Sequence, residues 1–388
     1  MINAYAAFEA KGPLKPYQYD PGELGAFDIE IDVDHCGICH SDVSMLDNDW
    51  GRAQYPMVAG HEIIGRVSKL GSHVSHLVLG DVVGLGWHAG YCESCRMCMG
   101  GDHNLCSTAK GTIVGRHGGF ADKVRAQAIS AVKIPAGVNP ATAGPLLCGG
   151  ITVYNPLVQF NISPQSKVAV IGVGGLGHMA VMFLKAWGCE VTAFSSDPSK
   201  TNELKSMGAH HVLNSKDPDA LKKAAGSFDL ILSTVNVKLD WNAYISTLAP
   251  KGRLHFLGAV LEPLDIGVFG LMGQQRTISS SPVGSPRVIA DMLKFAALHN
   301  IQPIVETYRF EQINEAIEKV RNGSPRFRWY CHDNPPLFTP HPHPLMRLIS
   351  LSIERNLGGR VLNTSRNGKR PKKAQRGLQE FATNLSRE

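Results

Sequence analysis

The sequence predicts an α/β protein of two domains, a mostly β domain followed by a domain built on a doubly wound parallel sheet. The length of 388 residues is enough for two hydrophobic cores. Residues 1–150 contain short β-type stretches separated by glycine. From about residue 151, strands and helices alternate, which is typical of a parallel sheet covered by helices on both faces.

The expected strands of the first domain are short and lie between long loops. They occur at 29–33, 63–67 and 81–85, each as a run of alternating or apolar residues. Several of the loops between them hold Cys, His and Gly. We therefore expect this domain to present functional groups on loops of a β scaffold.

The second domain alternates strictly between the two element types. Its expected elements, in chain order, are a buried strand, a helix and three further strands: 167–172, 175–187, 190–194, 228–232 and 253–257. Two amphipathic helices follow at 286–299 and 311–320, and we expect both to return to the first domain. The predicted domains are therefore 1–150, completed by about 286–328, and 151–285.

A glycine-rich turn directly follows the first strand of the second domain and opens its first helix. It reads Gly172-Val-Gly174-Gly175-Leu176-Gly177. The first glycine suits a tight turn, the second lets the backbone approach a pyrophosphate, and the third lets helix and strand pack closely. The helix N-terminus also attracts the anion. A turn of this kind between a strand and a helix predicts a dinucleotide-binding domain of the Rossmann type.

The end of the next strand favours NADP over NAD. An NAD site has an acidic residue there, which binds the ribose hydroxyls. This chain has Ser195 and Ser196 instead, with Lys200 nearby, and these groups suit a ribose 2′-phosphate. Asp197 is the alternative ribose ligand, but it precedes Pro198 and is expected to cap the following helix.

Four cysteines cluster on one short loop, at positions 92, 95, 98 and 106. Four thiolates can close a tetrahedral Zn²⁺ site, and a zinc without an open coordination position is structural. An iron–sulfur cluster is the rival interpretation because its ligands are also closely spaced cysteines. A disulfide pair is the remaining alternative, and it is unusual in the cytosol. We expect Cys92, Cys95, Cys98 and Cys106 to bind a structural zinc.

The net charge of +6 is concentrated at the end of the chain. Residues 331–388 carry ten Lys or Arg and four Asp or Glu, whereas residues 1–330 carry 29 of each kind. The main body is neutral, so its composition indicates no nucleic-acid partner. No apolar run reaches the roughly 20 residues that a membrane span needs, and the N-terminus has no signal-peptide pattern. We therefore expect a cytoplasmic protein that binds no membrane.

Several motifs, taken together, resemble the medium-chain zinc alcohol dehydrogenases, particularly the cinnamyl alcohol dehydrogenase branch. The resemblance covers residues 1 to about 328. It rests on the four-cysteine loop and on Cys-Gly-Ile-Cys-His-Ser-Asp at 36–42, Tyr-Pro-Met-Val-Ala-Gly-His-Glu at 55–62, Pro-Leu-Leu-Cys-Gly-Gly-Ile-Thr-Val-Tyr at 145–154 and Gly-Val-Gly-Gly-Leu-Gly-His-Met at 172–179. It implies a GroES-like catalytic domain joined to the Rossmann domain, and a homodimer or homotetramer.

The resemblance also implies an open catalytic zinc site on Cys39, His61 and Cys148, three residues that spacing alone does not connect. It implies that Ser41 hydrogen-bonds the substrate oxygen and that Asp42 orients His61. The remaining implied roles are an approach to the zinc by Glu62, contacts to cofactor phosphates by His40 and Arg328, and packing against the nicotinamide by Thr152. Cys36, Cys189 and Cys331 have no implied ligand role.

The implied reaction converts an alcohol and NADP⁺ reversibly to an aldehyde, NADPH and a proton, with zinc as the Lewis acid. In many relatives a histidine ends the proton relay, at the position that Ser44 matches here. Serine is no general base near neutral pH, so we expect water or His40 to carry the proton and the pH–rate profile to differ. Trp50 lies in the loop that builds the substrate pocket and suits aromatic or medium aliphatic aldehydes; local packing is its alternative role.

The resemblance stops after Arg328. The family ends on a strand of the form Arg-Tyr-Arg-Val-Val-Leu, whereas here residues 329–333 read Trp-Tyr-Cys-His-Asp, before a Pro-, His- and Arg-rich run. If the last base of the Arg328 codon is G, a shifted reading frame gives Val-Val-Leu and permits a stop shortly after. We hypothesise that residues 329–388 are a frameshifted extension. A disordered tail or a basic interaction arm is the alternative.

Two other functions compete with the dehydrogenase assigned above. One is an NAD-dependent polyol or formaldehyde dehydrogenase of the same family, which NAD preference and a polar pocket would favour. The other is a non-catalytic protein that binds zinc and NADPH. The complete set of Cys39, Ser41, His61 and Cys148 argues against the non-catalytic alternative.

Overall fold

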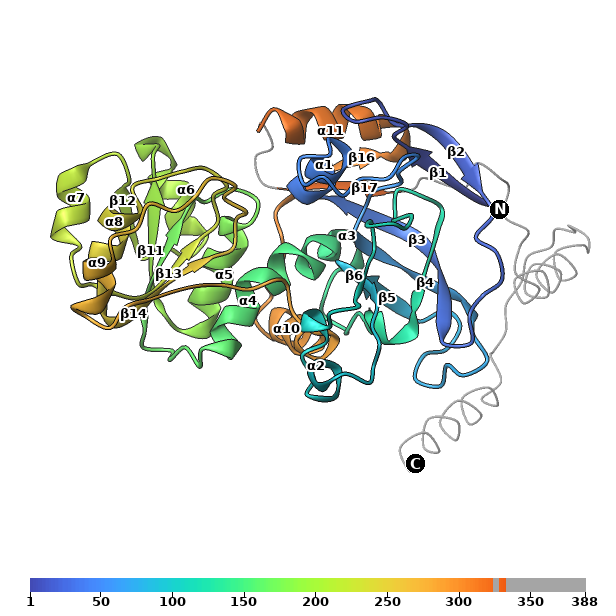
Figure 1. The fold of residues 1–388 in the computed structure, drawn as a ribbon, viewed down its shortest axis with the longest axis horizontal. Coiled ribbons are helices and arrows are strands. Elements are labelled where there is room, and N and C mark those ends of the chain that lie inside the picture. Colours follow the sequence, from blue (N-terminus) through green and yellow to red (C-terminus); the bar gives the residue numbers. More distant parts are fainter. Residues whose placement is uncertain (324–327, 333–388) are drawn as a thin grey trace, which may run out of the picture. The chain divides into compact units, whose positions relative to one another are not determined.

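The computed structural model describes residues 1–323 and the backbone of residues 328–332. Two large sheets dominate this part of the chain (Figure 1). Both belong to one compact unit, Met1–Asn334. Among the described residues, no helix combines the length and the apolar character that a membrane span requires.

The first large sheet has seven strands and is mainly antiparallel, with the order β16-β17-β3-β4-β5-β9 and with β8 paired to β3. Its strands are β3 (Asp28–Ile38), β4 (Glu62–Leu70), β5 (Val82–Leu85), β8 (Lys123–Gln127), β9 (Ala131–Lys133), β16 (Val305–Arg309) and β17 (Arg328–His332). Two small sheets flank it, formed by β1 (Ile2–Ala6) with β2 (Lys15–Tyr19) and by β6 (His88–Gly90) with β7 (Lys110–Gly111).

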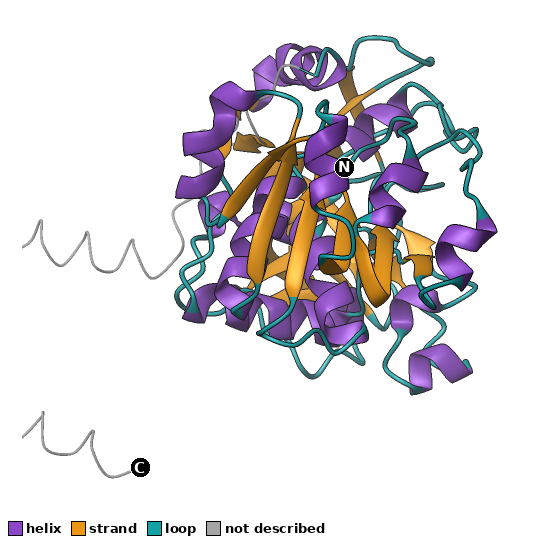
Figure 2. Cartoon of the chain, turned by 90° about the vertical axis from the view of Figure 1, so that its left-hand side faces the viewer, coloured by secondary structure: helices purple, strands orange, loops and turns teal. Residues whose placement is uncertain are grey.

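The second large sheet has six strands, all parallel, and helices cover both of its faces (Figure 2). Its strands are β10 (Lys167–Ile171), β11 (Glu190–Ser195), β12 (His211–Asn214), β13 (Phe228–Ser233), β14 (Leu248–Phe256) and β15 (Thr277–Ser280). The order β12-β11-β10-β13-β14-β15 is the doubly wound order of a dinucleotide-binding sheet. Along β10, Val168 and Val170 enter one core while Ala169 and Ile171 enter the other, which explains its continuous apolar run.

Eleven α-helices lie among the described residues: α1 (His40–Leu46), α2 (Arg96–Met99), α3 (Pro140–Ala143), α4 (Gly149–Gln159), α5 (Gly177–Trp187), α6 (Thr201–Ser206), α7 (Pro218–Lys223), α8 (Trp241–Ser246), α9 (Val268–Met272), α10 (Pro286–Leu298) and α11 (Ile313–Arg321). As predicted, the chain returns to the first sheet after the parallel sheet. Helix α10 packs against β9 and α4, and α11 packs against α1 and β3.

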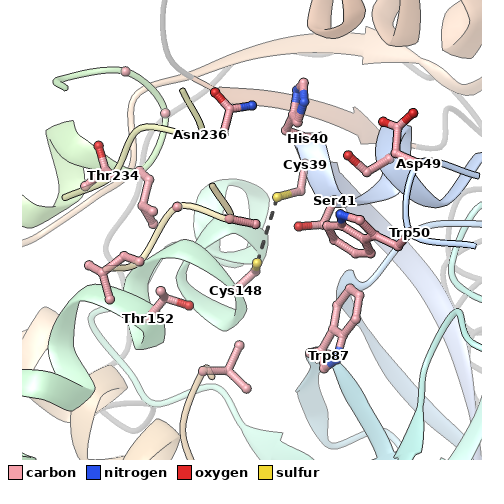
Figure 3. Close-up of a pocket in the computed structure, with 18 of the residues that line it drawn as sticks. Cys39, His40, Ser41, Asp49, Trp50, Trp87, Cys148, Thr152, Thr234 and Asn236 are labelled. Atoms are coloured by element: carbon pink, nitrogen blue, oxygen red, sulfur yellow. Dashed lines mark hydrogen bonds between the residues drawn. The ribbon is translucent and has the colours of Figure 1, made fainter. Parts of the chain in front are cut away.

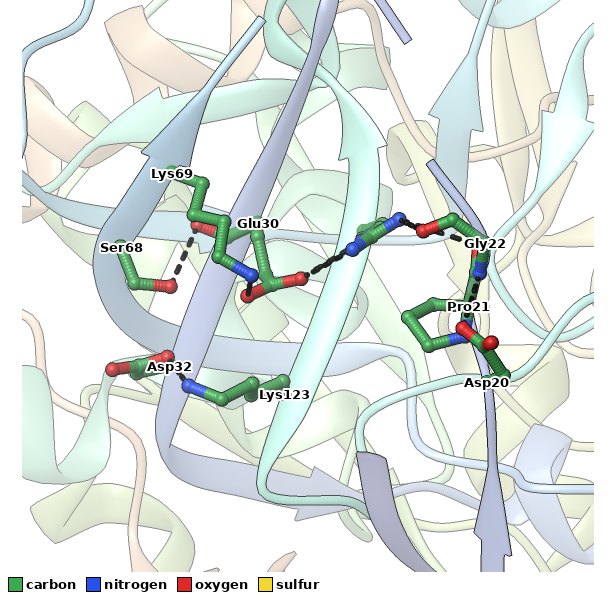
Figure 4. Close-up of polar contacts among 9 residues, drawn as sticks. Asp20, Pro21, Gly22, Glu30, Asp32, Ser68, Lys69 and Lys123 are labelled. Carbon is green, nitrogen blue, oxygen red and sulfur yellow. Dashed lines mark hydrogen bonds and ion pairs between the residues drawn. The ribbon is translucent and has the colours of Figure 1, made fainter. Parts of the chain in front are cut away.

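A buried carboxylate anchors β3, the strand that leads to the site described below. Glu30 is 1% exposed and lies between Lys69 of β4 and Arg125 of β8 (Figure 4). Burial alone would raise the pKa of Glu30, but these two cations hold it below its usual value. Arg125 also donates to the carbonyl oxygens of Pro21 and Gly22, at 3.2 and 2.8 Å. The pairing thus fixes β3 against β4 and β8.

The structure corrects several predicted boundaries. Helix α5 begins at Gly177 rather than at residue 175 because the preceding residues form the turn itself. The helix expected from 311 starts as a 3-10 turn, and α11 proper begins at Ile313. The fifth strand of the parallel sheet, β14, begins at Leu248, five residues before the expected start. The first of these changes moves Gly175 and Leu176 from the expected helix into the turn.

The expected break after Arg328 falls inside a strand. The backbone of β17 pairs in parallel with β16 and antiparallel with β3, and Trp329 lies opposite Ile38. The backbone of residues 329–332 therefore continues the first sheet, although these residues were expected to belong to a frameshifted extension. Backbone pairing is open to almost any side chain, so the last strand position can be filled despite the altered sequence. The rest of the predicted extension, 333–388, lies outside the described residues.

Candidate active site

The turn from β3 into α1 places four of the predicted site residues, Cys39, His40, Ser41 and Asp42. Cys39 is the N-cap of α1, and Asp42 occupies the third helical position. The Asp42 carboxylate accepts a hydrogen bond of 2.9 Å from the backbone N–H of Cys39. An acidic residue at this position stabilises a helix start, so the Cys-His-Ser-Asp sequence begins the helix and orients the cysteine at the same time.

Four potential metal ligands converge behind this turn. The ligand atoms of Cys39, His61, Glu62 and Cys148 lie within 4.8 Å of one another, and all four residues are buried. The sulfurs of Cys39 and Cys148 are 3.9 Å apart, and Nε2 of His61 is 3.2 Å from the Cys148 sulfur. Two sulfurs of a tetrahedral zinc site, with Zn–S bonds of about 2.3 Å, lie about 3.8 Å apart. The donor set and its spacing therefore fit zinc.

Besides its contact with Cys39, the Asp42 carboxylate contacts the imidazole of His61 and orients that ring. Oδ1 of Asp42 is 2.8 Å from Nδ1 of His61, and both side chains are fully buried. Burial alone would lower the pKa of His61, but the Asp42 carboxylate outweighs it and holds that pKa well above its usual range. The same negative charge stabilises a metal ion on Nε2, because it fixes the tautomer that leaves this nitrogen free to coordinate. The predicted role of Asp42 thus agrees with its position.

The position of the Glu62 side chain requires a glycine at the paired position on β3. A Cβ atom at Gly37 would lie 2.1 Å from Oε2 of Glu62. Gly37 pairs with Glu62 across β3 and β4, so any side chain there would displace the carboxylate from the ligand group. Sequence reasoning missed this role of Gly37, although the glycine between two cysteines in a predicted loop is a signal that could have shown it.

A cavity of about 810 Å³ opens in front of the two cysteines. The indoles of Trp50 and Trp87 meet edge to face, 6.1 Å apart, and form one wall, with Ser41 beside Trp50 (Figure 3). The predicted residues that line the cavity are Cys39, His40, Ser41, Trp50, Cys148, Thr152, Gly174, Gly175 and Leu176. Those that do not line it are Asp42, His61, Glu62, Gly172, Gly177, Ser195, Ser196 and Lys200. Ser44, the predicted departure from the family, lines it and is 5% exposed.

Sequence reasoning missed three other parts of this cavity. Trp87 directly follows β5 and Gly86, and its ring lies 5.0 Å from that of His61. Thr234 and Asn236 follow β13, and residues 281–283 follow β15. The carboxyl ends of parallel strands meet at one edge of a sheet, so the positions after the predicted strand 228–232 were recognisable candidates. Trp87 follows a strand of the other sheet, and residues 281–283 follow a strand that the sequence did not predict.

The glycine-rich turn has the geometry that its sequence predicts. Gly172 has φ +82°, which favours glycine, and a Cβ at Gly177 would lie 1.9 Å from the carbonyl oxygen of Gly172. A Cβ at Gly174 would meet nothing within 4 Å, so this position faces open space at the cavity. The turn can therefore admit a pyrophosphate at the start of α5.

The end of β11 arranges Asp197 as a helix cap. Its carboxylate accepts hydrogen bonds from the backbone N–H and the hydroxyl of Ser199, at 3.0 and 2.6 Å. Ser199 is also the first cause of the lowered pKa of Asp197, and Lys200 and Lys216 add to it. The expectation that Asp197 caps the following helix is confirmed. Its carboxylate is thus engaged locally, whereas the exposed Lys200 leaves a positive charge at the strand end.

The four-cysteine loop forms a second group of metal ligands. The sulfurs of Cys92, Cys95, Cys98 and Cys106 lie within 4.8 Å of one another. That of Cys92 is 3.9 Å from Cys98 and 3.6 Å from Cys106. Backbone N–H groups of Ser94 and Cys95 lower the pKa of Cys92 to about 5, whereas burial raises that of Cys98 to about 12. The thiols of Cys92 and Cys98 therefore differ in how readily they ionise. A divalent cation would remove this difference, because it stabilises all four thiolates together.

The remaining cysteines behave as expected where the structure describes them. None of the eight described cysteines forms a disulfide. Cys36 and Cys189 are buried, and their sulfurs lie 3.5 and 3.6 Å from the carbonyl oxygens of Gly37 and Ser163. The side chains of Cys331 and Arg328 lie outside the described part of the chain, so the predicted phosphate contact of Arg328 stays a prediction.

Two family models match two separate stretches of the chain. The alcohol dehydrogenase GroES-like domain matches residues 25–136, and the zinc-binding dehydrogenase domain matches residues 175–297. The chain is 58% identical over 328 residues to the aldehyde reductase AdhA of Synechocystis, with 84% of this chain and 98% of that protein covered. It is 37% identical to the NADP-dependent alcohol dehydrogenase C 1 of Mycolicibacterium smegmatis, covering 84% and 97% of the two chains.

The solved structures agree with this assignment. The cinnamyl alcohol dehydrogenase of Sorghum bicolor superposes with a TM-score of 0.82 at 34% identity, covering 85% of this chain and 97% of that one. The resemblance in sequence, the two predicted folds and the two groups of zinc ligands therefore point to the same family. The chain belongs to the medium-chain zinc alcohol dehydrogenases, as an oxidoreductase with a GroES-like catalytic domain and a Rossmann domain.

Proposed function

We propose that this enzyme transfers a hydride between NADP(H) and a primary alcohol or aldehyde, with an aromatic or medium aliphatic side chain. The observation that carries the proposal is the shared cavity. Cys39 and Cys148 line it from one side and the glycine-rich turn lines it from the other. We further propose domain bounds of 1–150 with about 286–328, and 151–285, because the parallel sheet draws its strands from 151–285. The other large sheet draws its strands from 1–150 and 286–328, except that β17 extends from Arg328 to His332.

The chemistry divides between the bound groups and the chain. When bound, zinc supplies a Lewis acid for the carbonyl oxygen and NADPH supplies the hydride. Cys39, His61 and Cys148 would hold the catalytic zinc, with Glu62 close enough to approach it, and Asp42 would keep His61 in the coordinating tautomer. Ser41, beside Cys39 in the cavity, would hydrogen-bond the substrate oxygen and pass on its proton. His40 would contact a cofactor phosphate, and Thr152 would pack against the nicotinamide.

The indole pair supports the proposed substrate class. Trp50 and Trp87 present a broad apolar wall on the side of the cavity that bears Ser41. Aromatic rings and medium aliphatic chains gain most from burial against such a surface. A polyol would leave its hydroxyl groups without partners along this wall, so the polyol alternative is disfavoured.

The first test measures the rate of NADPH oxidation with a panel of aldehydes as substrates, in the presence and absence of a zinc chelator. We expect turnover with aromatic and medium aliphatic aldehydes, and loss of turnover when the catalytic zinc is removed. Benzaldehyde and hexanal represent the two classes, and a short sugar aldehyde serves as the polar control. Failure of every aldehyde to support NADPH oxidation would refute the proposed function.

NADP preference is expected to depend on Lys200. Substituting Lys200→Ala removes a cation from the proposed 2′-phosphate site, with Ser195 and Ser196 left in place. A charge-assisted hydrogen bond is worth about 1.5–3 kcal/mol, so we expect KM for NADPH to rise about 10- to 100-fold. KM for NADH, which lacks the phosphate, should hardly change. Lys205→Ala, in the neighbouring helix α6, is the matched control and should leave both values as they are.

Ser44→His is expected to change the pH–rate profile. Ser44 lines the cavity on α1 but cannot act as a base near neutral pH. A histidine there would add a group that titrates at about pH 6.5, so the plot of kcat/KM against pH should gain an inflection around that pH. Ser44→Asn, which is polar but does not titrate, controls for the larger side chain. Identical profiles for the wild type and Ser44→His would show that this position takes no part in proton transfer.

The assembly proposed for the protein follows from the family resemblance, and its proposed location follows from the sequence expectations given above. We propose a homodimer or homotetramer in the cytoplasm. Small-molecule alcohols and aldehydes are the proposed partners, with no nucleic-acid partner. Sedimentation velocity of the purified chain would measure the oligomeric state directly.

A further inference from the structure

One side of the cavity is formed by a short segment outside any regular element, Ser281–Val283, which we call the wall segment. All three of its residues line the cavity. The segment connects β15, which ends at Ser280, to α10, which begins at Pro286. It faces the cavity shared by Cys39, Cys148 and the glycine-rich turn, so its position shapes the place where a cofactor and a substrate would meet.

Each residue of the wall segment has a polar contact to another part of the fold. Oγ of Ser281 is 3.0 Å from Nε2 of His255, in β14. Asn104 donates to the carbonyl oxygen of Pro282, at 3.2 Å. Asn155 of α4 donates to the carbonyl oxygen of Val283, at 2.8 Å. Irregular backbone keeps one position only when such contacts fix it, so this pattern indicates a segment that is held rather than free.

His255 is the most unusual of the three anchors. It lies fully buried between Leu254 and Phe256, near the carboxyl end of β14 in the parallel sheet. Its Nδ1 is 2.8 Å from Oγ of Ser279, so both ring nitrogens have a serine hydroxyl as partner. An apolar residue would fill this space without the cost of burying a polar ring. What the imidazole adds is a fixed direction for two hydroxyl groups.

The surroundings of His255 hold its ring in place. Phe160, the C-cap of α4, meets it edge to face at 5.1 Å, and the Arg253 guanidinium lies 3.9 Å from the Phe160 ring centroid. Burial and Arg253 lower the pKa of His255 to about 4, so the imidazole is neutral at physiological pH. A neutral ring has one donor and one acceptor nitrogen, and a serine hydroxyl can complement either.

We propose that His255 is a positioning residue, which fixes Ser281 and with it the wall segment against which the reactive end of the cofactor rests. Helix α4 supports the wall segment in two ways. Asn155 donates a hydrogen bond to it directly, and the Phe160 ring packs against that of His255. A backbone shift of about 1 Å at such a wall can cost about 100-fold in rate, because the reacting atoms must stay aligned. The part of this proposal that concerns the cofactor rests on the proposed function.

The test compares three variants of the full-length protein. His255→Val keeps the strand apolar but removes both hydrogen bonds, and His255→Gln keeps an amide that can reach Ser281. Thr247→Val is the matched control: Thr247 is fully buried in the same domain, and its hydroxyl donates to the carbonyl oxygen of Tyr244 at 2.7 Å, away from the cavity. Two readouts are taken besides activity: amide hydrogen exchange of the peptide 279–285 without ligand, and the Kd for NADPH.

We expect His255→Val to speed exchange in this peptide and to weaken NADPH binding about tenfold, with partial rescue in His255→Gln. Thr247→Val should change neither, even if it lowers the melting temperature. Unchanged exchange and unchanged Kd in a folded His255→Val would overturn the proposal. If that variant does not fold, Ser279→Ala, which removes only the Nδ1 partner, is judged by the same two readouts. If the wild type binds no NADPH, the proposed function fails and hydrogen exchange alone decides whether His255 fixes the wall.

Discussion

Cys148→Ser should remove one of two zinc ions per chain and lower kcat/KM by about a thousandfold or more. Cys148 lies at the N-cap of α4, with its sulfur 3.9 Å from Cys39 and 3.2 Å from His61. A serine hydroxyl binds zinc far more weakly than a thiolate, and the Lewis acid contributes several kcal/mol to the stabilisation of the transition state. Elemental analysis of zinc and steady-state reduction of benzaldehyde measure the two effects.

The control for this prediction lies in the same short motif as Cys39. Cys36 is also a buried cysteine, but its sulfur lies 3.5 Å from the Gly37 carbonyl oxygen and it is not in the ligand group. Cys36→Ala should therefore keep two zinc ions and most of the activity. A Cys148→Ser enzyme that retained both metal ions and normal turnover would contradict the assignment of the catalytic ligands.

Cys98→Ser should instead lower the thermal stability, by about 10 °C or more in melting temperature. Cys98 is 4% exposed and packs with Cys106 and Tyr91 in a small core of its own. Between β6 and β7 the loop holds only a one-turn helix and a 3-10 turn, α2 and His103–Leu105, so little regular structure stabilises it. The free energy of metal binding at this loop adds to the free energy of folding, because the four thiolates are brought together only in the folded loop.

Differential scanning fluorimetry and zinc analysis check this second prediction. Cys189→Ser is the matched control, since Cys189 is buried in the other domain and its thiol donates only to the Ser163 carbonyl oxygen. The control should keep two zinc ions and a melting temperature close to that of the wild type. If Cys98→Ser had the same melting temperature as the wild type and kept both zinc ions, a structural zinc on this loop would be ruled out.

Local sequence was sufficient for four of the six strands of the parallel sheet. Apolar runs located β10, β11, β13 and the second half of β14, whereas β12 and β15 were not predicted. Gly172, Gly174 and Gly177 have the surroundings that their spacing predicts. The cap role of Asp197 followed from the proline after it, because a proline suits the first turn of a helix. These predictions succeeded because each depends on residues that are close together in the chain.

The boundaries and the walls of the cavity did not follow from the sequence. Trp87, Gly37 and His255 are separated from their partners by many residues, and each acts only through a neighbouring strand or helix. The end of the first sheet was also misplaced, because the pairing of Trp329 with Ile38 depends on backbone hydrogen bonds rather than on side-chain type. Long-range contacts of this kind leave no local pattern.

The zinc sites show the same division. The sequence by itself determined the four-cysteine site, since all of its ligands lie on one loop, from Cys92 to Cys106. It also determined the types of residue available for an open site, and the family resemblance connected them. Only the tertiary structure brought Cys39, His61 and Cys148 together, from the end of β3, the start of β4 and the start of α4. Metal coordination selects by distance in space, and distance along the chain does not limit it.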